Sequence, residues 1–199
     1  MHRVRVPAWP RHHGHSVEPM NSLTVNLHLM MATFYRPTKS RFKVLMEEPA
    51  FPSDTYAIKT QLIHHGLDPK DALVLARPRK DEFTVRTDDI LDVIEEHADD
   101  LAIVMLGAVN FFTGQLVDIE NVTAAAKKHG IVVGFDLAHA AGNVPLSLHE
   151  WNVDFAVWCS YKYLNAGPGA VAGAFVHVGQ RGKFTRSSEV GAIDLNRLL

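Results

Sequence analysis

The chain has 199 residues, of which 47% are hydrophobic and 21% are charged, and its formal net charge is −2 at pH 7. This balance is typical of a globular protein and gives no electrostatic reason to expect nucleic acid or a membrane surface as a partner. A single cysteine excludes a disulfide within the chain, and the longest uncharged run, residues 101–117, is too short to span a membrane. We therefore expect a cytoplasmic protein.

Apolar periodicity and glycine or proline punctuation predict alternating helices and strands. A first helix follows Ser22, a residue suited to an N-cap, because five apolar residues recur there at helical spacing: Leu23, Leu27, Met30, Met31 and Phe34. Strands are then predicted over residues 43–47, 72–76, 101–106, 131–136, 154–159 and 172–178, and helices over residues 54–65, 88–97 and 119–129. The alternation favours an α/β fold, a mostly parallel sheet flanked by helices.

Asp136 ends the apolar run of the strand predicted over residues 131–136. Two interpretations of its carboxylate stay open: an N-cap for a short helix over residues 137–141, or a partner for a cationic ring nitrogen. His139 would face the same way in a helical turn, either over such a ring or as a core histidine. In open sheets of this class, ligands collect at the carboxyl ends of strands, where Asp136 lies.

Lys162 lies in the glycine-bounded segment Cys159-Ser160-Tyr161-Lys162-Tyr163-Leu164-Asn165-Ala166-Gly167, between two predicted apolar strands. Most lysines are solvated surface charges, but an ammonium between two buried strands is costly without a function. A lysine after one strand and a carboxylate at the end of an earlier strand are typical of a pyridoxal phosphate site, as imine-forming amine and pyridine partner. The pattern predicts a pyridoxal phosphate enzyme.

Residues 20–178 resemble the kynureninase family of fold-type I pyridoxal phosphate enzymes. The resemblance rests on five segments in order: residues 20–29 (MNSLTVNLHL), 50–54 (AFPSD), 113–115 (TGQ), 134–140 (GFDLAHA) and 158–165 (WCSYKYLN). It implies hydrolytic Cβ–Cγ cleavage of L-kynurenine or 3-hydroxy-L-kynurenine to L-alanine and an anthranilate, in tryptophan catabolism and NAD biosynthesis. It also implies a cofactor-binding large domain over residues 19–178, and a homodimer at full length.

The resemblance further implies a role for each of ten site residues. Lys162 forms the imine with the cofactor and acts as a base, Asp136 holds the ring protonated, and Tyr161 binds the phosphate and carries protons. The remaining cofactor-binding residues are Leu23 and Thr24 at the phosphate, Phe51 stacked on the ring, Pro52, Ser53 and Asp54 in the same loop, and His139 over the ring. Independently, a helix N-terminus favours phosphate near Leu23, and Pro52 restricts Phe51 to an extended backbone.

Some of the chain departs from the family. Leu106-Gly107-Ala108 stands where the family often has a hydroxyl residue near the cofactor, so that Asn110 and Thr113 are the polar groups left in this loop. Residues 1–18 and 179–199 match nothing; we expect the first segment to be disordered and its histidines His12, His13 and His15 to be solvated rather than to bind metal. Because family members are longer, with a C-terminal small domain, we expect a fragment.

Two alternatives stay open. The chain could be another class V pyridoxal phosphate enzyme, a cysteine desulfurase or an aminotransferase. A desulfurase needs a mobile reactive cysteine, whereas Cys159 lies in a predicted core strand. The chain could also be a truncated remnant that keeps the motifs without turnover.

Overall fold

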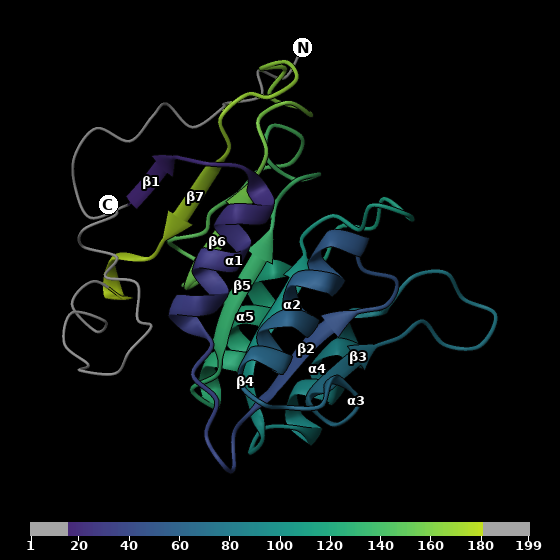
Figure 1. The fold of residues 1–199 in the computed structure, drawn as a ribbon. Helices are drawn as coiled ribbons and strands as arrows, with labels where there is room; N and C mark the ends of the chain where they lie inside the picture. The colour runs from purple at the N-terminus through teal and green to yellow at the C-terminus, as the bar shows by residue number, and fades with distance from the viewer. Residues whose placement is uncertain (1–15, 181–199) are drawn as a thin grey trace.

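The structure is a computed structural model, and it describes residues 16–180. Seven strands form one sheet in the order β1-β7-β6-β5-β4-β2-β3 (Figure 1). The strands are β1 (Ser16–Pro19), β2 (Lys43–Glu47), β3 (Leu73–Ala76), β4 (Leu101–Gly107), β5 (Val132–Asp136), β6 (Phe155–Trp158) and β7 (Gly173–Val176). Strands β2 to β6 pair in parallel, whereas β7 is antiparallel to both β6 and β1. The predicted α/β fold with a mostly parallel sheet is confirmed.

Helices cover both faces of this sheet. They are α1 (Leu23–Phe34), α2 (Pro52–His64), α3 (Pro69–Ala72), α4 (Thr87–Glu96) and α5 (Ile119–Lys128), followed by the 3₁₀ turn η1 (Val178–Gln180). Helices α1 and α2 lie on the face nearer the viewer in Figure 1, and α4 and α5 lie behind the sheet. Buried side chains form one cluster on each side, the first around Met30 and Ile58 and the second around Ile94 and Val122. Strands β4 and β5 are apolar along their length because both of their faces are covered.

Element boundaries agree with the sequence-based predictions to within two residues. Helix α2 begins at Pro52 rather than at residue 54, because proline is well suited to the first position of a helix. Residues 137–141 form a turn and not the short helix considered above; the Ala141 N–H still donates to the Leu137 carbonyl at 2.8 Å.

Strand β1 was not predicted. It includes residues 16–18 of the segment expected to be disordered, and it pairs Ser16 to Pro19 with Val176 to Gly173. Residues 1–15, with His12, His13 and His15, and residues 181–199 of the divergent tail lie outside the described residues. Between residues 16 and 180, no helix has the length and hydropathy needed to cross a membrane, and no three side chains are grouped in a way that suits a metal ion.

Candidate active site

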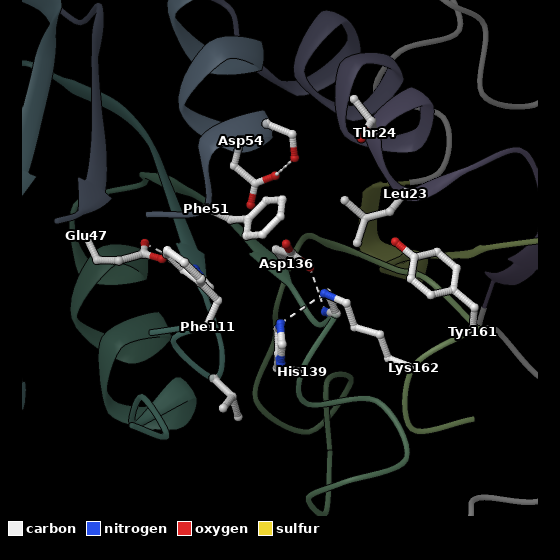
Figure 2. A pocket seen from close by; sticks show the side chains of 14 residues that line it. Leu23, Thr24, Glu47, Phe51, Asp54, Phe111, Asp136, His139, Tyr161 and Lys162 are labelled. Carbon is white, nitrogen blue, oxygen red and sulfur yellow. Dashed lines mark hydrogen bonds between the residues drawn. The ribbon is translucent and has the colours of Figure 1, made fainter. Parts of the chain in front are cut away.

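A pocket of about 470 Å³ opens where the carboxyl ends of β2, β4 and β5 meet the starts of α1 and α2 and the loop that follows β6 (Figure 2). It brings together nine of the ten predicted site residues: Leu23, Thr24, Phe51, Ser53, Asp54, Asp136, His139, Tyr161 and Lys162. Pro52 does not line the pocket. It occupies the first position of α2, and its neighbour Phe51 has the expected extended backbone (φ −61°, ψ 136°).

The start of α1 supplies one wall of the pocket. Ser22 is its N-cap, and the Ser22 hydroxyl accepts a hydrogen bond from the Val25 N–H at 3.4 Å. Leu23 and Thr24 are the first two helical residues, and no side chain in residues 16–180 caps their N–H groups. Free N–H groups and the helix dipole together make this end of α1 a place for an anion such as phosphate.

Lys162 lies on the loop between β6 and β7, with its amine directed into the pocket. Its Nζ is 2.9 Å from His139 Nε2 and 5.4 Å from the centre of the Phe51 ring. Partial burial, and then the charge of Lys162, lower the pKa of His139, so its imidazole is neutral at pH 7 and Nε2 can accept a hydrogen bond from the amine. The lysine is therefore held by an uncharged partner.

Tyr161, the preceding residue on this loop, borders the pocket on the side of α1 (Figure 2). Its side chain is half exposed. Burial of the remainder raises the pKa of its phenol, and a hydrogen bond with the buried Cys159 adds to the shift. The phenol thus stays protonated and can donate a hydrogen bond.

Two buried carboxyl groups, Asp54 and Asp136, share the floor of the pocket. Asp136 Oδ1 accepts the Ala138 N–H at 2.6 Å, and Ser53 Oγ donates to Asp54 Oδ1 at 3.3 Å. Burial raises the pKa of both groups, and their mutual hydrogen bond raises the pKa of Asp54 while it opposes the rise in Asp136. Asp54, whose pKa is raised to about 9, therefore keeps its proton at neutral pH, while the charge of Lys162 opposes the rise in the pKa of Asp136 and so favours its ionised form.

Of the two interpretations of Asp136, the structure supports a cap, over a turn rather than a helix, and the pairing with a cationic ring nitrogen stays a prediction. Its carboxylate caps the turn that follows β5, and it also lines the pocket. The two functions are compatible, because a carboxylate has lone pairs enough for a backbone N–H and a ligand.

Sequence reasoning missed four residues that line the same pocket, Glu47, Val109, Phe111 and Ala138, whereas Gly107, noted there at the family's hydroxyl position, also lines it. Phe111 packs edge-on against Phe51, with ring centres 5.2 Å apart, so it supports the ring expected to stack on a ligand. Glu47 could have been recognised in the sequence as a carboxylate at the end of a predicted strand. In the structure this strand, β2, pairs with β4, which ends at Gly107.

These groups fit pyridoxal phosphate. The Lys162 amine suits an aldehyde, the Asp136 carboxylate a protonated pyridine nitrogen, the Phe51 ring an aromatic face, and the start of α1 a phosphate. The strongest structural sign is Asp136 itself. It is 8% exposed and forms no ion pair within 4.0 Å in residues 16–180, so a cationic ring would satisfy it.

Comparison with known proteins places the chain in a family. The sequence model of the family described as aminotransferase class-V matches residues 70–179, more than half of the chain. The chain belongs to this family. The match takes in β3 to β7 and with them Asp136, His139, Tyr161 and Lys162, whereas the starts of α1 and α2 lie outside it.

Curated proteins similar to this chain carry the name kynureninase. The chain is 58% identical over 161 residues to a kynureninase of Nematostella vectensis and 60% identical over 158 residues to a kynureninase of Myxococcus xanthus. These alignments cover 81% and 79% of the chain, but 35% and 37% of the relatives. The chain therefore spans about a third of the length of the curated relatives it matches.

Solved structures of the family share the fold. An alanine–glyoxylate aminotransferase from Nostoc sp. superposes with a TM-score of 0.67 at 21% identity, over 92% of this chain and 46% of that protein. At this identity, the likeness establishes the architecture of the sheet and its helices and says nothing about the substrate.

Proposed function

We propose that this chain carries the cofactor-binding part of a kynureninase, which hydrolyses the Cβ–Cγ bond of L-kynurenine or 3-hydroxy-L-kynurenine to L-alanine and anthranilate or 3-hydroxyanthranilate. The observation that carries the proposal is the convergence of Lys162, Asp136, Phe51 and the start of α1 on one pocket, in a chain 58–60% identical to proteins named kynureninase. Pyridoxal phosphate, when bound, supplies an aldehyde for the substrate amine and a ring that withdraws electrons from its α-carbon.

The residues of the chain then have separate tasks. Lys162 Nζ would hold the cofactor at its aldehyde, and its free amine would take a proton from the α-carbon of the substrate. His139 Nε2, at 2.9 Å, orients the amine and keeps it within the pocket. Asp136 holds a proton on the ring nitrogen, while Phe51 restricts the ring to one plane. Tyr161 and the start of α1 would bind the phosphate, and the protonated Tyr161 phenol would return protons, a role supported by its raised pKa and its place in the pocket lining.

The same proposal includes a cytosolic homodimer. Two observations support it: the one cysteine of the chain is a buried thiol, and two neighbouring aromatic side chains are exposed, Phe111 in the pocket lining at 37% and Phe112 beside it in the sequence at 68%. A second subunit would cover such a surface.

Two other reactions of class V pyridoxal phosphate enzymes are the alternatives: transamination and desulfuration. Desulfuration is disfavoured because the only cysteine is 2% exposed at the end of β6 and cannot reach a substrate without unfolding its surroundings. Transamination uses the same cofactor chemistry, so an analysis of the products has to distinguish it from hydrolysis of kynurenine.

Borohydride reduction tests the cofactor half of the proposal. Reduction of the chain in the presence of pyridoxal phosphate should fix the cofactor on Lys162, as peptide mass analysis will show, and Lys162→Arg should abolish the label. Lys59→Ala, on the exposed side of α2, is the matched control and should keep it. A label spread over surface lysines, with none on Lys162, would refute the assignment.

Product analysis tests the reaction. A protein extended to the length of the relatives should form alanine and anthranilate from kynurenine in equal amounts. Alanine that appears only when pyruvate and an amino donor are supplied would instead identify an aminotransferase.

A further inference from the structure

Glu47, the last residue of β2, is a third carboxyl group in the pocket that the proposed chemistry does not use. Its side chain is 8% exposed, and its two oxygens, Oε1 and Oε2, lie 3.1 and 3.2 Å from the Gly107 nitrogen, whose N–H they accept. Within residues 16–180, Glu47 has no cationic partner at ion-pair distance. A carboxyl group buried in this way is costly, so its presence calls for a physical reason.

The Glu47 carboxyl group fills the space that a side chain on residue 107 would need. A Cβ atom on residue 107 would lie 2.8 Å from Glu47 Oε1, closer than a Cβ atom approaches a non-bonded oxygen, so the Glu47 carboxyl group would have to move. The backbone of Gly107 is outside the left-handed region, so its conformation does not require glycine. The absence of a side chain at residue 107, where the resemblance implies that the family often has a hydroxyl residue, therefore provides room for the Glu47 carboxyl group.

The groups that face Glu47 are acidic. Asp136 on β5 and Asp54 on α2 both interact with it, and Lys162 and His139 lie on the pocket side of Asp136. Burial raises the pKa of Glu47 to about 7; the charge of Asp136 adds to the rise and backbone N–H groups, including that of Gly107, oppose it. The charge of Glu47 therefore changes near neutral pH, next to the carboxylate that faces the ring nitrogen.

We propose that Glu47 is a positioning residue for the cofactor ring, acting through Asp136: its carboxylate, seated in the room left by Gly107, deepens the negative potential that holds the protonated ring nitrogen. The proposal rests on the proposed function, since it needs a cofactor with such a ring. When Glu47 ionises, the ring cation gains a second nearby negative charge and binds more tightly. When Glu47 is protonated, the only negative charge left next to the ring nitrogen is that of Asp136.

The test compares the dissociation constant of pyridoxal phosphate for the chain and for Glu47→Gln at several pH values, measured by fluorescence. The glutamine oxygen still accepts the Gly107 N–H, so the variant removes the charge and keeps the shape. The affinity ratio of the two proteins should be near 1 at about pH 6 and rise to about fivefold to tenfold at about pH 8. Glu48→Gln, which alters an exposed neighbour paired with Arg77, is the control and should give a ratio near 1 throughout.

Gly107→Ala provides a second, independent variant. The added Cβ should displace the Glu47 carboxyl group and reproduce the pH-dependent loss, and the double variant should lose no more than either single one. Circular dichroism of each variant without cofactor checks that the fold is intact.

The outcomes separate the two proposals. A ratio for Glu47→Gln that does not change with pH, or losses that add fully in the double variant, overturns the role of Glu47 and leaves the proposed function standing. Failure of the unmodified chain to bind pyridoxal phosphate, with no label on Lys162, overturns both.

Discussion

The charge on the floor of the pocket depends on the protonation of two buried carboxyl groups, Asp54 and Asp136. Asp54, with its pKa raised to about 9, is protonated at neutral pH and can donate to Asp136, while the charge of Lys162 favours the ionised form of Asp136, which lies at the end of β5 and can face a cation. Two neighbouring carboxyl groups with different protonation states are a common way to assign separate roles to identical side chains.

The first prediction at this scale concerns Asp136. Asp136→Ala should weaken pyridoxal phosphate binding by about tenfold or more, since a protonated ring loses its charge partner, and should slow hydrogen exchange at the α-carbon of a bound amino acid. Asp136→Glu should be milder because the charge is kept. Affinity and exchange measurements, the latter by NMR in deuterium oxide, check both. Unchanged exchange in the alanine variant would mean that Asp136 only caps the turn after β5.

A second prediction concerns stability without cofactor. Burial raises the pKa of Asp54, so its stabilising contribution is fully present below the ordinary aspartate range and is lost as the pH rises through the value in the folded chain. Asp54→Asn keeps a donor for Asp136 and never ionises. Its free energy of unfolding should exceed that of the unmodified chain by about 1–3 kcal/mol at about pH 8 and by less at about pH 5.

Urea denaturation at the two pH values measures this difference. Asp68→Asn changes an exposed N-cap carboxyl group of α3 and serves as the control, because its effect should not grow as the pH rises. An Asp54→Asn variant that is less stable at the higher pH would contradict the protonated state assigned to Asp54.

Among the elements, α1 has the clearest separate task in the proposed function, since its start is expected to bind the phosphate. Thr24→Val should weaken binding of pyridoxal phosphate by about fivefold, the equivalent of one lost hydrogen bond, and leave binding of pyridoxal unchanged because that molecule has no phosphate. Titration with both compounds checks this. Thr60→Val, at an exposed position of α2, should affect neither. An equal loss for both compounds would place Thr24 near the ring instead.

The central elements could be predicted from the sequence because each of them has a strong local pattern. Buried apolar runs define β4 and β5, and helical periodicity together with Ser22 defines α1. Strand β1 could not be predicted, since its four residues, SVEP, have no such pattern and are extended because they pair with β7. The reversal of β7 is equally a property of the assembled sheet.

The candidate site divides in the same way. Lys162 and Asp136 stand out because a charged residue interrupts or ends an apolar run. Glu47 also ends a strand, but glutamate at such a position is ordinary on a surface, and only the fold brings it against Gly107, 60 residues away in sequence. Phe111 was missed for a similar reason: its contact with Phe51 joins two loops.

On the scale of the whole molecule, residues 16–180 close the pocket at its floor and along α1 and leave its mouth open. Residues 16–180 provide its floor and the wall formed by α1, while Phe51, Phe111 and Tyr161 at its mouth are 37–51% exposed. The curated relatives are about three times as long as the part they share with this chain. Groups that hold the substrate in reacting geometry are therefore expected to come from outside these residues.

This arrangement predicts that a polypeptide of residues 1–199 has little kynurenine-cleaving activity, about 100-fold below a version extended to the length of the relatives, because small losses of positioning are costly to rate. Steady-state assays of both proteins, soluble and loaded with cofactor to the same extent, check the prediction. Comparable turnover by the two would show that residues 1–199 already contain the substrate-binding groups.

The pairing of β1 with β7 has a mechanical consequence for this pocket. Backbone hydrogen bonds from Met20 to Ala172 (2.9 Å) and from Ala172 to Asn21 (3.0 Å) fasten the beginning of α1 to the far end of the loop that carries Lys162. The start of α1 and the lysine loop are thus joined directly, and the pairing of β1 with β7 extends this connection. Deletion of β1 would remove no residue that lines the pocket and would leave these two hydrogen bonds, but the start of α1 and the lysine loop would be held less firmly against each other.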